Sequence, residues 1–129
     1  NTGHAGSLTT VHANSARDAL ARLETLILMA GMDLPLSAAR EQIASAIDIV
    51  VQQSRFACGA RKITSIAEVT GMEGGRVQMQ ELFHFERIGL ENGRTLGRFR
   101  GCDTVPGFYE ELRAMGVAVD LSIFDRETA

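Results

Sequence analysis

The chain has 129 residues, 45% of them hydrophobic, and a formal net charge of −3 at pH 7. This length fits a single domain, and the apolar content is ordinary for a protein that folds around a core. Because the basic residues are scattered along the sequence, we expect no nucleic-acid partner. Apolar runs stay well short of the roughly 18 residues of a membrane-spanning helix, so an integral membrane protein is not expected either.

The first fifteen residues carry the densest group of side chains that suit a ligand. His4 and His12 can each donate or accept a hydrogen bond, and the hydroxyl groups of Thr9 and Thr10 lie between them. Gly6 has no side chain and lets a ligand approach the backbone closely. This mixture favours the polyphosphate end of a nucleotide over an apolar ligand.

We interpret Leu8 to His12 as a short β strand. His12 would then lie at the end of a strand just before a helix, a place where α/β proteins present ligand-binding groups. An imidazole there could donate a hydrogen bond to a terminal phosphate. The alternative is a buried histidine that caps the following helix.

Two helices are expected between about residues 15 and 46. Asn14 or Ser15 would cap the first helix, because both residue types are strong N-caps. Apolar residues then recur with helical spacing until Gly31, which would end the helix. Ser37 would begin the second helix.

Three arginines of this helical region, Arg17, Arg22 and Arg40, could serve as cations toward a neighbouring subunit. An arginine supplied in trans can stabilise the charge of a phosphoryl group in transfer. The commoner outcome is a solvated or salt-bridged helix face, with acids such as Glu24 as local partners.

An antiparallel β meander is expected over about residues 47–101. It would start with a β-branched run, Ile49 to Val51, typical of a strand buried on both faces. Turns are expected at Cys58-Gly59, Glu73-Gly74-Gly75 and Glu91-Asn92-Gly93.

Alternation in the second half of the meander predicts one apolar face made by Val77, Met79, Phe83 and Phe85. His84 would point the other way, toward solvent. A short helix is expected over about residues 107–115. The two cysteines lack metal-ligand spacing, so we expect reduced thiols and no metal site.

Several segments resemble a known family. Thr2 to Ser15, TGHAGSLTTVHANS, resembles the histidine box of the ATPases of type II and type IV secretion, which include the motors of type IV pili. The resemblance continues through REQIASAIDIVVQQSR, from Arg40 to Arg55, and through residues 61–86. Within this group the chain is most similar to the ATPase of tight-adherence (Flp) pilus assembly.

The resemblance implies an α+β fold that is the C-terminal part of a RecA-like ATPase domain, over residues 1–129. It implies a hexameric ring of identical subunits with ATP and Mg²⁺ at the interfaces, in which His12, assisted by His4, senses the terminal phosphate. Gly6, Thr9 and Thr10 would contribute to nucleotide binding. The protein would be cytoplasmic and would work on pilus or secretion platform proteins of the inner membrane.

The sequence contains no GxxxxGK[ST] phosphate loop. We therefore expect a piece of a longer motor subunit that neither hydrolyses ATP nor binds nucleotide or Mg²⁺ tightly by itself. Two alternatives stay open. One is a stand-alone adaptor or assembly module that keeps the motor fold, and the other is a small nucleotide-binding regulator.

Overall fold

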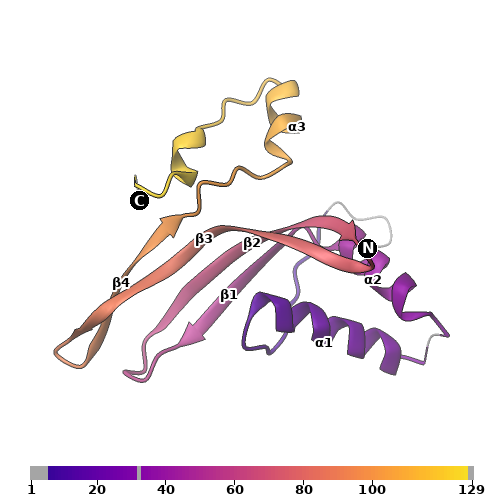
Figure 1. The fold of residues 1–129 in the computed structure, drawn as a ribbon, viewed down its shortest axis with the longest axis horizontal. Coiled ribbons are helices and arrows are strands. Elements are labelled where there is room, and N and C mark those ends of the chain that lie inside the picture. Colours follow the sequence, from indigo (N-terminus) through magenta and orange to yellow (C-terminus); the bar gives the residue numbers. More distant parts are fainter. Residues whose placement is uncertain (1–5, 32, 128–129) are drawn as a thin grey trace.

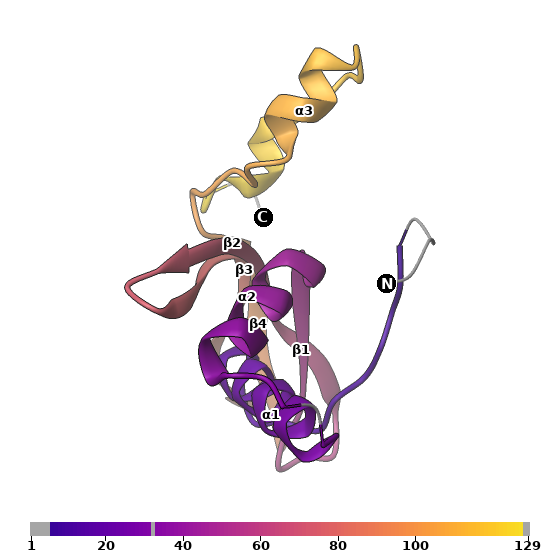
Figure 2. The same ribbon diagram turned by 90° about the vertical axis from the view of Figure 1, so that its right-hand side faces the viewer.

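The computed structural model describes residues 6–31 and 33–127 as an α+β fold. A four-stranded sheet forms its middle layer (Figure 1). Two helices cover one face of this sheet, and the C-terminal segment lies on the other face (Figures 1 and 2). In chain order the elements are α1 (Ala16–Met29), α2 (Leu36–Ala46), β1 (Ile49–Arg55), β2 (Arg61–Glu73), β3 (Arg76–Glu91), β4 (Arg94–Gly101), α3 (Tyr109–Ala114) and the 3₁₀ helix η1 (Leu121–Phe124).

The sheet is the predicted meander. Its strands lie in the order β1-β2-β3-β4, and each neighbouring pair is antiparallel. The three predicted turns connect them. Asn92 and Gly93 have φ of 50° and 76°, and positive φ at both central residues is typical of the tight turn whose twist suits a hairpin. This part of the prediction is confirmed.

The helix boundaries follow from local chemistry. The Ser15 hydroxyl accepts a hydrogen bond from the Asp18 backbone N–H at 3.0 Å, which confirms Ser15 as the N-cap of α1. Gly31, with φ of +74°, follows the last turn of α1 as predicted. The second helix begins at Leu36, directly after Pro35 and one residue before the predicted start.

The principal core lies between the helices and the sheet. Leu20 of α1, Ile43 of α2, Val69 of β2 and Val77 of β3 form a buried cluster. Partly buried apolar residues surround this cluster: Leu23, Ile27, Ala44, Ile47, Val50, Met72 and Met79. Each helix therefore contributes one apolar stripe, and the sheet contributes one apolar face.

The predicted single apolar face of β3 is wrong, because β3 contains a bulge. The pairing steps from Ile66↔Phe83 to Ala67↔Glu81, which leaves Leu82 as an extra residue. An extra residue reverses the alternation, so side chains before and after it point to opposite faces. Met79 contacts the core under the helices, whereas the Phe83 ring lies 5.2 Å from the Phe124 ring on the other face.

The prediction that β1 is buried on both faces is also wrong for the described residues. Along β1 exposed residues alternate with half-buried ones, and Val51 is 54% exposed. The strand lies at the edge of the sheet and pairs with β2 alone. One face contacts the helices through Val50, and the other face of β1 is open.

The C-terminal segment is attached to the sheet by aromatic packing and by one buried carboxyl group. Phe124 is 3% exposed and lies against the rings of Phe83 and Tyr109. Glu68 of β2 accepts hydrogen bonds from the Gly107 backbone N–H, at 3.0 and 3.1 Å, and from the Gln80 amide. The predicted helix over about 107–115 is confirmed as α3, while η1 was not predicted.

Truncating the core should cost stability. Replacing Leu20 by alanine removes a side chain that is 3% exposed and leaves a cavity between α1 and the sheet. We predict a loss of about 2–4 kcal/mol in the free energy of unfolding, measured by urea denaturation. Leu26→Ala on the same helix is the matched control, because Leu26 is 47% exposed and should cost far less. Equal losses for the two variants would contradict this packing.

Removing the Glu68 carboxyl group should loosen the C-terminal segment. Glu68→Ala leaves the Gly107 N–H and the Gln80 amide without their acceptor, at a cost of about 1–3 kcal/mol. We predict faster amide hydrogen exchange in residues 107–124 and little change in α1. The control is Glu73→Ala, at the exposed end of β2. Unchanged exchange in residues 107–124 would show that this contact does not hold the segment.

Candidate functional site

Residues 6–13 form an extended arm that leads into α1 (Figure 2). The predicted strand from Leu8 to His12 is wrong, because these residues adopt neither helix nor strand. A strand requires a hydrogen-bonded neighbour, and a groove separates the arm from the edge of β1. The arm is held at its end, where the Gln52 side-chain amide donates to the Ala13 carbonyl at 3.1 Å.

The groove between the arm and the sheet has a volume of about 790 Å³. Its three sides come from different elements. They are arm residues 6–13, the α1 residues Ala19, Leu20 and Leu23, and residues 46–53, which run from the end of α2 into β1. The result is an open groove lined by both polar and apolar residues.

Four of the predicted ligand-binding residues line this groove together. Gly6, Thr9, Thr10 and His12 all lie on the arm and are exposed. The buried-histidine alternative for His12 is therefore excluded, and Ser15 rather than His12 caps α1. His4 lies outside the described residues. The binding roles assigned to these side chains stay predictions.

The three arginines do not line the groove. Arg17 donates to the Val77 carbonyl at 2.7 Å and so ties α1 to β3. Arg40 pairs with Glu24 at 2.9 Å and also donates to the Gly75 carbonyl at 3.2 Å. Arg22 is exposed on α1. The salt-bridged alternative thus describes Arg40, and a role toward a neighbouring subunit stays a prediction for all three.

The polar residues on the β1 side of the groove were not predicted as site residues. Asp48, Gln52 and Gln53 line it opposite the arm. The Asp48 carbonyl accepts a hydrogen bond from the Val69 N–H at 2.9 Å, which holds this residue at the start of the strand. An acid that interrupts an apolar run was the available signal, but only the structure shows that Asp48 lines the same groove as His12.

The two cysteines are free thiols, as expected. Their surroundings differ. A backbone hydrogen bond from Thr95 is the main influence that lowers the pKa of Cys58 to about 7. Burial, and then the nearby Glu81 carboxylate, raises the pKa of Cys102. The exposed Cys58 is therefore the more reactive thiol at neutral pH.

Within the described part of the chain, every helix is too short or too polar to cross a bilayer.

Comparison of the sequence with known proteins places this chain in a family. A sequence profile described as type II/IV secretion system protein matches residues 1–114. A putative conjugal transfer protein of Mycobacterium tuberculosis (strain H37Rv) is 37% identical over 87 residues, covering 67% of this chain and 24% of that protein. The conjugal transfer protein TrbB of Rhizobium radiobacter is 38% identical over 88 residues, covering 68% of this chain and 25% of that protein.

This chain thus spans about a quarter of the length of these curated relatives. The profile, in contrast, covers nearly all of the described residues, from the arm through α3. The chain belongs to the family of type II/IV secretion system proteins.

Proposed function

We propose that this chain is the C-terminal part of a secretion or conjugal-transfer motor ATPase, and that its groove forms one wall of the nucleotide site. The observation that carries the proposal is the arm itself. Thr9, Thr10 and His12, which carry its hydroxyl and imidazole groups, are exposed, and all three line an open groove. Groups of this kind can donate hydrogen bonds to phosphate oxygens.

The other side of the site is proposed to come from the rest of the polypeptide, as part of a RecA-like domain. The unpaired edge of β1 supports this, because an open strand edge offers N–H and C=O groups to a further strand. Ile49 and Val51 are 37% and 54% exposed and give β1 an apolar surface that further polypeptide could cover. The greater length of the relatives supports it as well.

The donor set of the groove fits an anion better than a metal ion. Asp48 is the only carboxylate among the described residues that line it. We therefore propose that ATP and Mg²⁺ are held mainly by groups elsewhere in the polypeptide, and that His12 contacts the terminal phosphate. His12 would lose this contact when the phosphate leaves, and the arm, joined directly to α1, could pass the change to the helical layer. His4 is proposed to assist.

The assembly is proposed to be a cytoplasmic hexameric ring bound to an inner-membrane platform. Arg22 is the best candidate for a cation that reaches a neighbouring subunit, because Arg17 and Arg40 already bind carbonyl groups within the chain. Pilus assembly of the tight-adherence type stays a proposal, whereas the names of the relatives support conjugal transfer.

The role of His12 can be tested by measuring the rate of ATP hydrolysis by the complete native polypeptide. We predict that His12→Ala lowers kcat at least tenfold, about 1.4 kcal/mol in activation free energy, while nucleotide affinity changes little. The matched control is Thr25→Ala, since Thr25 is an exposed residue of α1 whose hydroxyl donates to the Ala21 carbonyl of the same helix.

Unchanged turnover in His12→Ala would contradict the proposal. The 129-residue chain alone should show no turnover above that of its own His12→Ala variant. If the native polypeptide with its wild-type sequence does not hydrolyse ATP but still binds the proposed inner-membrane platform, the non-catalytic adaptor is the better description. Tight ATP binding by the 129-residue chain alone would favour the small nucleotide-binding regulator.

A further inference from the structure

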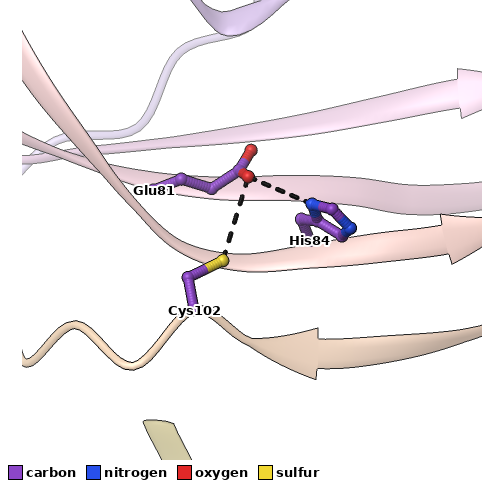
Figure 3. A group of neighbouring side chains, drawn as sticks. All are labelled: Glu81, His84 and Cys102. Carbon is purple, nitrogen blue, oxygen red and sulfur yellow. Dashed lines mark hydrogen bonds and ion pairs between the residues drawn. The ribbon is translucent and has the colours of Figure 1, made fainter. Parts of the chain in front are cut away.

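Three side chains with metal-binding atoms gather at the bulge of β3, away from the groove. They are Glu81 and His84 of β3 and Cys102, the residue that follows β4 (Figure 3). Their ligand atoms all lie within 4.8 Å of one another. None of the three residues lines the groove of the arm, so this cluster is independent of the proposed nucleotide site.

The bulge creates the cluster. In a regular strand Glu81 and His84, three positions apart, would point to opposite faces. The extra residue Leu82 reverses the alternation between them and brings both side chains to one side. The same bulge holds the third member in place, because the Leu82 carbonyl accepts a hydrogen bond from the Cys102 N–H at 3.0 Å.

The separations are close to those of a tetrahedral metal centre. Glu81 Oε1 lies 3.2 Å from His84 Nδ1 and 3.8 Å from Cys102 Sγ. Around Zn²⁺, with bonds of about 2.0–2.3 Å, neighbouring ligand atoms lie roughly 3.3–3.6 Å apart. Small side-chain rotations are therefore enough to direct all three atoms at one ion. Figure 3 shows the carboxylate oxygen between the ring and the sulfur.

A further residue already orients the central ligand. The Ser65 hydroxyl donates to Glu81 Oε2 at 2.7 Å, which fixes the carboxylate and leaves Oε1 facing the histidine and the cysteine. Such supporting hydrogen bonds are typical of metal sites, where they hold the ligand in its binding orientation. Glu81 and His84 are both exposed, so an ion could reach the cluster from solvent.

We propose that Glu81, His84 and Cys102 bind a divalent transition-metal ion of the Zn²⁺ class, with water as the fourth ligand. One nitrogen, one oxygen and one sulfur ligand suit Zn²⁺ and exclude Mg²⁺ and Ca²⁺, which prefer oxygen alone. Binding replaces the S–H bond of Cys102 by a metal–sulfur bond and releases one proton to water. The ion would tie the bulge of β3 to the point where the chain leaves β4 for the C-terminal segment.

The spacing of the cysteines in the sequence indicated no metal site, and this proposal departs from that expectation. The reason is that Glu81 and His84 become neighbours only through the bulge at Leu82, which the sequence did not indicate. The third comes from the far end of the next strand.

Co²⁺ is the probe of choice, because its tetrahedral complexes absorb visible light and its bond to a thiolate adds a charge-transfer band. In a Cys58→Ser background the only thiol is Cys102. We predict that this chain binds one Co²⁺ with a thiolate band, that Cys102→Ser abolishes the band, and that His84→Ala or Glu81→Gln weakens binding at least tenfold. Glu73→Gln, which changes an exposed carboxylate outside the cluster, should bind as the parent does.

A second measurement guards against variants that fail to fold. Zn²⁺ should displace Co²⁺ and raise the thermal unfolding midpoint of the Cys58→Ser chain, but not that of a folded Cys102→Ser variant, as verified by circular dichroism. The proposal is overturned if no Co²⁺–thiolate band forms or if the band persists in the Cys102→Ser variant. It is also overturned if the wild-type chain shows the band and the Cys58→Ser chain does not, because Cys58 would then be the metal ligand.

Discussion

Two irregularities in the pairing of β2 with β3 decide which side chains reach which layer. At the first, the register steps from Val69↔Met79 to Gly71↔Gln78, so that Thr70 is an extra residue of β2. Val69 and Met72, three positions apart, therefore both contact the core under the helices. The second is the bulge at Leu82 in β3, beyond which apolar side chains turn to the opposite face. Because of these two irregularities, the β2–β3 hairpin contacts the helices on one face and the C-terminal segment on the other.

The open groove follows from this arrangement. The helices and the C-terminal segment both pack on the central hairpin, which leaves β1 at the edge with one face open. The arm before α1 cannot close that edge, because it lies across the groove from β1 and only its last residues are tied to the strand. The exposed residues with imidazole and hydroxyl groups thus line the same groove as an unpaired strand edge, a combination that a further segment of polypeptide could complete.

Features that depend on a few neighbouring residues were predictable from the sequence. The Ser15 cap, the end of α1 at Gly31 and the Asn92-Gly93 turn each rest on local backbone chemistry. The bulges at Thr70 and Leu82 were not predictable, because a register shift depends on how two strands fit together.

The candidate site was predictable only as far as it depends on residue types along a short stretch of sequence. Residue types alone singled out His12 and the threonines of the arm, and the structure brings them to one groove. The expected strand there failed because it had no neighbour to pair with. His84 was correctly expected at the surface, but its proximity to Cys102 depends on the bulge.

The central claim is that this groove is one half of a phosphate site completed by other polypeptide. An experimental structure of the native protein with a non-hydrolysable ATP analogue tests it most directly. The account predicts a further strand hydrogen-bonded to the free edge of β1 and an imidazole nitrogen of His12 about 3 Å from an oxygen of the terminal phosphate. A nucleotide bound elsewhere, with the edge of β1 still open and His12 in bulk solvent, would contradict it.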